Sequence, residues 1–276
     1  MHSLNDNLPI EFPFPRRIKY IVCCDLDETY IPFLEADKKY GGISALENFM
    51  CSHGTEKGIV IGWITGSNLS SAVRKSRGYI SYSPHFICCS LGTEFYWVKQ
   101  GLLIPSSSWQ KKIESIGFKK ESVNQIVAEA KRKGIVLTRQ SEDYQGPFKT
   151  SFYYKKRNDF SDDVAWFEQI AAQYGIRVLL TKCNPAAGDP VGCYDADFIP
   201  VCCGKDEAVD FVRNQLFIPK DKVIAFGDSC NDLPMFSRSG RSFLTGNAEP
   251  MAKKQMGYHL EKSYCHGILS VLQELN

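Results

Sequence analysis

The feature that most constrains the fold is an apolar run over residues 18–24 that ends in two carboxylates, Asp25 and Asp27. A continuous apolar run of this length is typical of a strand buried on both faces, as in parallel sheets. Open α/β sheets bind their ligands outside the carboxyl ends of such strands. Because Asp-x-Asp also occurs in ordinary turns and metal loops, the pair by itself leaves a catalytic and a structural interpretation open.

Strand-like and helical patterns alternate from residue 18 to residue 89, and the alternation returns from residue 205 to the end of the chain. Such alternation predicts a parallel sheet with right-handed crossovers. The expected strands are 18–24, 58–64, 85–89, 222–226 and 242–245, and the expected helices are 44–52, 68–75, 205–216, 232–237 and 267–275.

The middle of the chain has paired strand-like runs separated by helices, which predicts an α+β insert. The expected strands there are 95–98, 102–104, 135–137, 151–154, 177–181 and 195–199, and the expected helices are 120–133 and 162–174. With 276 residues the chain is long enough for two domains. We therefore expect a Rossmann-like α/β core from residues 1–90 and 198–276, with an inserted domain at 91–197.

Composition excludes several classes of partner. The formal charge is +2 and the basic residues are dispersed, so we expect no nucleic-acid partner. Eleven cysteines include three adjacent pairs in or beside apolar runs and no Cys-x-x-Cys, which favours buried, reduced thiols over a disulfide frame or zinc site. The sequence has no apolar stretch of signal-peptide or membrane-spanning type, and we expect a cytoplasmic protein with a small-molecule substrate and no membrane partner.

Two helix starts carry candidate phosphate ligands. Strand 58–64 ends at Thr65, Gly66 and Ser67, where hydroxyls, a backbone turn and a helix start can cradle a phosphate. An ordinary turn with a helix cap is the alternative. Lys205 opens the helix over 205–216, where it can neutralise a phosphate or lie on the solvated surface.

A third segment is rich in oxygen ligands. Strand 222–226 is followed by a glycine turn that contains Asp228, Asn231 and Asp232. Carboxylate and amide oxygens suit magnesium, which takes a few protein ligands and keeps several waters. A turn that caps the next helix is the competing interpretation.

Taken together in this order, these segments resemble the motifs of the haloacid dehalogenase superfamily of phosphatases. The likeness covers the core, residues 16–89 and 198–276. Only about 40 residues separate Asp25 from Thr65, whereas 140 separate Thr65 from Lys205. The resemblance therefore implies a cap domain of the C2B type, inserted in the second interval, that determines substrate specificity.

The resemblance also implies roles for the individual residues. Asp25 is the expected nucleophile, and Asp27 the general acid and base. The expected ligands of Mg²⁺ are Asp25, the Asp27 carbonyl and Asp228, with Asn231 and Asp232 orienting them. The expected phosphate ligands are Thr65, Gly66, Ser67 and Lys205.

Residues 91–94 resemble the sucrose-phosphate phosphatase branch at the entry to the cap. Segments 152–154, 182–190 and 194–200 are similar to the bacillar kanosamine-6-phosphate phosphatases, and the likeness extends into the core. It implies hydrolysis of kanosamine 6-phosphate in antibiotic biosynthesis. A broader hexose-phosphate or sucrose-phosphate phosphatase and a non-catalytic phosphosugar-binding protein are the alternatives. The candidate sugar ligands are Glu94, Asn184, Asp189, Asp195 and Asp197.

Overall fold

The computed structural model describes residues 8–183, 185 and 188–276, which form two compact units. The larger unit contains Met1–Trp109 and Lys205–Asn276, and the smaller one contains Gln110–Gly204. The chain therefore leaves the larger unit once and returns to it once.

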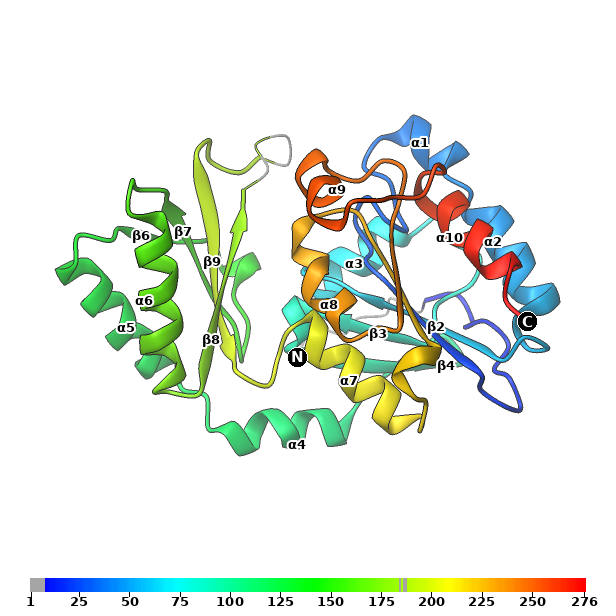
Figure 1. The fold of residues 1–276 in the computed structure, drawn as a ribbon. Coiled ribbons are helices and arrows are strands. Elements are labelled where there is room, and N and C mark those ends of the chain that lie inside the picture. The colour runs from blue at the N-terminus through cyan, green and yellow to red at the C-terminus, as the bar shows by residue number, and fades with distance from the viewer. Residues whose placement is uncertain (1–7, 184, 186–187) are drawn as a thin grey trace. The chain divides into compact units, whose positions relative to one another are not determined.

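A seven-stranded sheet forms the larger unit, with strand order β11-β10-β1-β2-β3-β4-β5 (Figure 1). Its first five strands are mutually parallel, and β4 and β5 continue the sheet in antiparallel fashion. The strands are β1 (Tyr20–Cys24), β2 (Ile59–Ile64), β3 (Phe86–Cys89), β4 (Glu94–Lys99), β5 (Leu102–Pro105), β10 (Val223–Gly227) and β11 (Arg241–Leu244).

Helices cover both faces of this sheet because the central strands are apolar on both sides. Leu46 of α2, Ala72 of α3 and Ile268 of α10 belong to the same buried cluster as Val22 and Cys24 of β1. Helices α2 and α10 lie side by side (Figure 1). The helices of this unit are α1 (Glu35–Tyr40), α2 (Ile43–Phe49), α3 (Leu69–Ser76), α7 (Lys205–Gln215), α8 (Leu233–Ser237), α9 (Pro250–Met256) and α10 (Tyr264–Gln273).

The opposite face is packed with aromatic rings. Phe86 of β3 stacks on Phe95 of β4 with 5.5 Å between ring centroids, and Phe95 meets Phe211 of α7 at 4.9 Å. Trp109 also contacts Phe211, with 4.6 Å between centroids. Helix α7 is thereby fixed against the sheet by a desolvated aromatic cluster.

The smaller unit has a four-stranded antiparallel sheet of order β6-β7-β9-β8. One face of this sheet is buried with helices α5 and α6 in a cluster that includes Ile126, Tyr154, Phe167 and Phe198. The elements are β6 (Leu137–Arg139), β7 (Thr150–Lys155), β8 (Ile176–Lys182), β9 (Cys193–Pro200), α5 (Lys120–Arg132) and α6 (Phe160–Ala172), and α4 (Ser107–Ile116) spans the junction between the units in sequence.

The boundary of the insert differs from the expected 91–197, because β4 and β5 belong to the seven-stranded sheet of the larger unit. A hairpin can add to the edge of β3 without a crossover, and Cys88 pairs with Phe95 in antiparallel register. The sequence identifies both strands but not the sheet that they join. Helices α1, α4 and α9 were not expected either.

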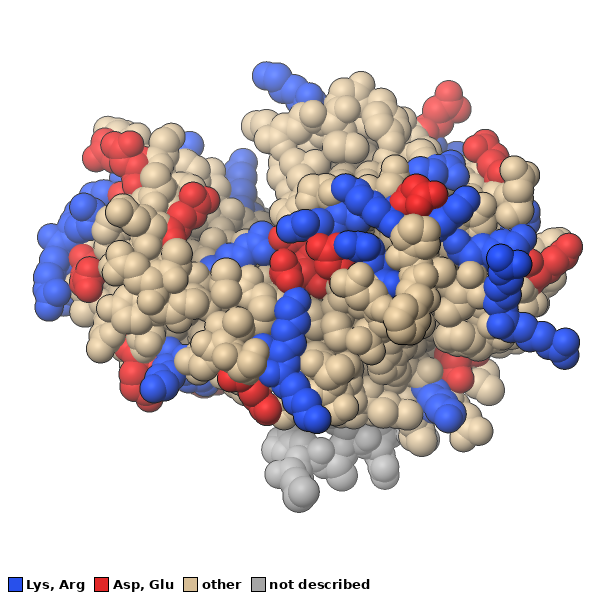
Figure 2. All heavy atoms as spheres, turned by 60° about the horizontal axis from the view of Figure 1, so that its bottom comes forward, with Lys and Arg blue, Asp and Glu red and all other residues tan. Residues whose placement is uncertain are grey.

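The eleven cysteines all lie in the described part of the chain, and the three adjacent pairs are buried. No helix among the described residues is long and apolar enough to span a membrane. On the face shown in Figure 2, Lys and Arg side chains are interspersed with Asp and Glu.

Candidate active site

Three neighbouring strands bring the predicted site segments to one edge of the larger sheet. Strand β1 lies between β10 and β2, with Cys24 in register with Phe226 on one side and Trp63 on the other. Asp25, Thr65 and Asp228 each follow the end of one of these strands. Parallel strands end at the same edge of a sheet, so the local order of the chain dictates their convergence.

Lys205 is the central cation of this edge. Its Nζ atom lies 2.7 Å from Asp25 Oδ1, 2.6 Å from Asp232 Oδ1 and 3.1 Å from Asn231 Oδ1. The side chain is buried, which by itself would lower the lysine pKa, but Asp232 and Asp25 outweigh burial and raise it. Lys205 is therefore a fixed positive charge between two acidic segments.

Asp232 anchors the loop after β10. Its Oδ2 atom accepts hydrogen bonds from the backbone N–H groups of Asp228 and Ser229, at 3.0 and 3.1 Å. A Cβ atom on Gly227 would lie 2.4 Å from Asp232 Cγ, so this close approach requires glycine. Both carboxylate oxygens of Asp232 therefore accept hydrogen bonds from other residues of the site.

The carboxylates of Asp25, Asp228 and Asp232 form a buried cluster whose oxygens lie within 4.8 Å of one another. Burial, with Asp232 and Asp27 adding to it and Lys205 opposing, raises the pKa of Asp25 to about 7. Burial and the charges of Asp232 and Asp25 raise the pKa of Asp228 to about 9. Three carboxylates around one lysine have excess negative charge, and an all-oxygen donor set with this charge fits Mg²⁺.

Thr29 is a site residue that sequence reasoning missed. It is buried, and its hydroxyl donates to Asp228 Oδ1 at 3.0 Å across 199 positions of the chain. Its position in the same short motif as Asp25 and Asp27 was the available signal. The bond ties the loop after β1 to the loop after β10.

Asp27 is held by two donors from the neighbouring segment. Ser67 Oγ donates to Asp27 Oδ2 at 2.8 Å, and Lys75 Nζ, in the last turn of α3, donates to Asp27 Oδ1 at 2.7 Å. Lys75 also donates to Ser67 Oγ at 2.9 Å. A lysine late in a helix is common, so no sequence signal indicated this contact.

The expected phosphate-binding loop is a tight turn. The backbone N–H of Ser67 donates to Thr65 Oγ1 at 3.1 Å, and Thr65 is buried. The Ser67 hydroxyl donates to Asp27 Oδ2 and accepts from Lys75 Nζ. A Cβ on Gly66 would lie 3.3 Å from Leu91, which leaves little room for a side chain there.

The candidate sugar ligands fall in different units. Glu94 lies on β4 of the larger unit, where it accepts from Ser90 Oγ at 2.8 Å and from Tyr96 OH at 2.6 Å. Asp189, Asp195 and Asp197 lie in the smaller unit. Asn184 lies outside the described residues.

Within the smaller unit, Asp195 and Asp197 occupy the face of β9 opposite to the buried cluster, because alternate residues of a strand face opposite sides. Asp197 accepts from Ser151 Oγ and lies 3.5 Å from Lys149 Nζ, so its charge is compensated. Asp195 accepts from Gln140 Nε2 at 2.7 Å, and burial with the charges of Asp197 and Asp189 raises its pKa to about 6.

The two tyrosines of β7 also lie on opposite faces of the sheet of the smaller unit. Tyr154 is buried and its hydroxyl donates to Asp163 at 2.6 Å. Tyr153 is in register with Asp195, and its hydroxyl donates to Asp189 at 3.4 Å. Tyr153 therefore joins the acidic face, whereas Tyr154 packs in the core of the unit.

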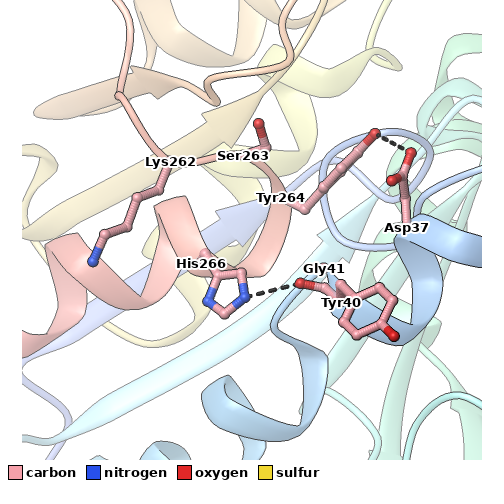
Figure 3. A pocket seen from close by; sticks show the side chains of 7 residues that line it. All are labelled: Asp37, Tyr40, Gly41, Lys262, Ser263, Tyr264 and His266. Carbon is pink, nitrogen blue, oxygen red and sulfur yellow. Dashed lines mark hydrogen bonds between the residues drawn. The ribbon is translucent and has the colours of Figure 1, made fainter.

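A cavity of about 470 Å³ lies elsewhere in the larger unit, between α1 and the start of α10 (Figure 3). Tyr264 OH lies 3.3 Å from Asp37 Oδ2 and 3.3 Å from Glu28 Oε2, and Glu28 follows Asp27 in the chain. His266 Nε2 is 2.9 Å from the Tyr40 carbonyl oxygen. None of the predicted site residues lines this cavity; the lining residues are Asp37, Tyr40, Gly41, Lys262, Ser263, Tyr264 and His266.

Comparisons with known proteins identify the family to which the chain belongs. The sequence model of sucrose-6F-phosphate phosphohydrolase matches residues 18–276. A kanosamine-6-phosphate phosphatase from Bacillus subtilis is 36% identical over 262 residues, which cover 93% of each chain.

Solved structures agree as well. A haloacid dehalogenase-like hydrolase from Bacillus subtilis superposes with a TM-score of 0.75 at 32% identity, covering 99% of this chain and 97% of that one. The sucrose-phosphatase of Synechocystis sp. PCC6803, in complex with sucrose and phosphate, gives a TM-score of 0.72 over 94% of this chain and 98% of that one. At 19% identity this second likeness concerns the fold alone. The expected haloacid dehalogenase-like α/β fold is confirmed.

Proposed function

Because the chain belongs to the sucrose-6F-phosphate phosphohydrolase family of haloacid dehalogenase-like hydrolases, and is thus a sugar-phosphate phosphatase, we propose that it hydrolyses kanosamine 6-phosphate with Mg²⁺. The products are kanosamine and inorganic phosphate. The observation that carries the proposal is the Lys205 ammonium between Asp25 and Asp232, beside Asp228, at the carboxyl edge of the sheet.

Mg²⁺ would be held by Asp25, the Asp27 carbonyl and Asp228, where its charge offsets the repulsion between a carboxylate nucleophile and a phosphate dianion. Asp232 and Asn231 orient this group through Lys205 and the backbone. The excess negative charge of the buried cluster supports a divalent cation there.

A carboxylate oxygen of Asp25 attacks phosphorus, and the bond from phosphorus to the sugar oxygen breaks. Asp27 gives a proton to the departing sugar oxygen, which leaves an aspartyl-phosphate on Asp25. Asp27 then takes a proton from water, whose oxygen attacks phosphorus. Inorganic phosphate leaves and the Asp25 carboxylate is restored, so atoms and protons balance over the cycle.

Thr65, the Gly66 amide and Lys205 hold the phosphate oxygens while charge redistributes in the transition state. Ser67 contributes its backbone to this turn, and its hydroxyl serves Asp27. Phosphoryl transfer depends mainly on such positioning and charge neutralisation.

Recognition of the amino group is assigned to the smaller unit, acting as the cap. The cationic amine of kanosamine favours an anionic partner. Asp195 suits this role better than Asp197, because Asp197 is already compensated by Lys149 and Ser151. Tyr153 and Asp189 lie on the same acidic face and supply further hydrogen-bonding groups.

The test is release of inorganic phosphate from kanosamine 6-phosphate, glucose 6-phosphate and sucrose 6-phosphate, with and without Mg²⁺. We expect the highest kcat/KM with kanosamine 6-phosphate, no activity after removal of Mg²⁺, and loss of activity in Asp25→Asn. Equal turnover of all three substrates would replace the kanosamine assignment with a broad hexose-phosphate phosphatase.

A chain that binds these phosphates without releasing any would instead be the phosphosugar-binding protein. Binding is measured by calorimetry with the Asp25→Asn variant, which retains the pocket and lacks the nucleophile. Saturable binding by this variant together with turnover by the wild-type chain supports the enzyme.

A further inference from the structure

One ion pair at the edge of the site is not explained by phosphate or metal binding. Lys75 Nζ donates to Asp27 Oδ1 and to Ser67 Oγ, and Ser67 Oγ donates to Asp27 Oδ2. The three side chains form a closed triangle around the carboxyl group that we assign as the general acid. Both oxygens of Asp27 are therefore engaged, each by a different donor.

The two donors are chemically unequal. An ammonium group can only donate, so the oxygen that faces Lys75 cannot carry the acid's proton toward it. A hydroxyl both donates and accepts, and Ser67 uses both capacities, because it accepts from Lys75 and donates to Asp27 Oδ2. The triangle thus gives each oxygen of the carboxyl group its own partner and fixes the orientation of the group.

Lys75 comes from a rigid element. Asn68 caps the start of α3 by accepting from the Ser71 N–H at 2.8 Å, and Ala72 and Val73 bury one side of the helix. The Lys75 side chain is 32% exposed to solvent, and its Nζ lies 5.8 Å from the centre of the Phe33 ring. A packed helix can hold the Asp27 carboxyl group in one orientation.

We propose that Lys75 is the positioning residue that, together with Ser67, orients the Asp27 carboxyl group for proton transfer to the sugar oxygen. The assignment rests on the acid role of Asp27 in the proposed function. Lys75 itself touches neither phosphate nor sugar in this scheme. It acts only through Asp27.

A change of leaving group separates this role from a structural one. A sugar alkoxide needs a proton as it departs, whereas p-nitrophenolate is stable without one. The constant kcat/KM covers the steps up to departure of the leaving group, so the later attack of water does not obscure the comparison. Misorientation of Asp27 should therefore lower kcat/KM for the sugar phosphate much more than for p-nitrophenyl phosphate.

The experiment measures kcat/KM for kanosamine 6-phosphate and p-nitrophenyl phosphate in Lys75→Met, Lys75→Arg and Arg74→Met. Arg74 is the exposed neighbour on the same helix and serves as the matched control. We expect Lys75→Met to lower the ratio of the two constants by about 10-fold, part of the ~10²–10⁴ that acid–base catalysis supplies. Lys75→Arg restores most of the ratio, and Arg74→Met leaves it unchanged.

A second arm uses the double variant Asp27→Asn/Lys75→Met. If Lys75 acts through Asp27, the double variant loses no more sugar-phosphate activity than Asp27→Asn alone. Additive losses, or an equal fall on both substrates in Lys75→Met, overturn the positioning role. Full sugar-phosphate activity in Asp27→Asn overturns the acid step of the proposed function itself, and this assignment with it.

Discussion

Replacement of Thr29 by valine should weaken binding of Mg²⁺ at the proposed site while leaving the fold intact. Thr29 is fully buried, and its hydroxyl is a donor to Asp228 Oδ1 at 3.0 Å. Valine keeps the branched shape and removes the donor. The Asp228 carboxyl group then loses the bond that fixes its orientation toward Asp25.

The magnitude follows from the kind of bond that is lost. Bound Mg²⁺ would keep Asp228 ionised, and a buried hydrogen bond to a charged group contributes roughly 1.5–3 kcal/mol. Since about 1.4 kcal/mol corresponds to a tenfold change, the apparent affinity for Mg²⁺ should fall by about 10- to 100-fold. Thr29→Ser keeps the hydroxyl and loses one methyl group, which costs about 1 kcal/mol of stability and little metal affinity.

The assay is phosphate release at saturating substrate over a series of Mg²⁺ concentrations, for wild type, Thr29→Val and Thr29→Ser. Thermal unfolding of the three proteins in parallel controls for damage to the fold. The reasoning is wrong if the valine variant has the wild-type half-saturating concentration of Mg²⁺. It is equally wrong if the serine variant is as impaired as the valine variant.

Three other predictions concern separate parts of the molecule. Gly227→Ala should abolish most activity, because the new Cβ displaces Asp232. It should also lower the free energy of unfolding, measured by urea denaturation, by ~1–3 kcal/mol. A wild-type kcat in this variant would contradict the prediction. The hydrogen bond from Arg157 lowers the pKa of Asp163 in the folded state. The pair therefore stabilises the fold at pH values above about 3.9, the pKa of an unfolded aspartate. This stabilisation is lost as the pH falls through the lower pKa of the folded state. Arg157→Met should therefore reduce the denaturation midpoint at pH 7 more than at pH 3. Burial raises the pKa of Asp195 to about 6. If Asp195 binds the amine as proposed, the KM for kanosamine 6-phosphate, relative to that for glucose 6-phosphate, should fall as the pH rises from 5 to 7, and Asp195→Asn should remove this dependence.

Local patterns in the sequence were sufficient to predict which candidate site residues meet at one edge of the larger sheet. The apolar run before Asp25 and the helix that starts at Lys205 each specify an end of an element, and parallel topology brings such ends to one edge. The expected family, α/β fold class and phosphatase activity are confirmed by the comparisons. The roles of Asp27 and Asp228 stay predictions.

The β4–β5 hairpin shows what a local sequence pattern does not predict, namely which sheet a strand joins. The sequence identifies two strands after residue 91, but the choice between the two sheets depends on contacts such as Phe95 with Phe86 and Phe211. Periodicity gives the face that a strand buries and not the partner against which it is buried. The boundary between the units was therefore misplaced.

The sequence alone thus determined which residues stand at strand ends and helix starts, because those positions follow from short-range patterns of apolar and polar residues. Tertiary structure alone decided that Thr29 holds Asp228, that Lys75 holds Asp27, and that Asp195 is hydrogen-bonded by Gln140. The first two contacts join segments 199 and 48 positions apart, and no local pattern encodes such a distance.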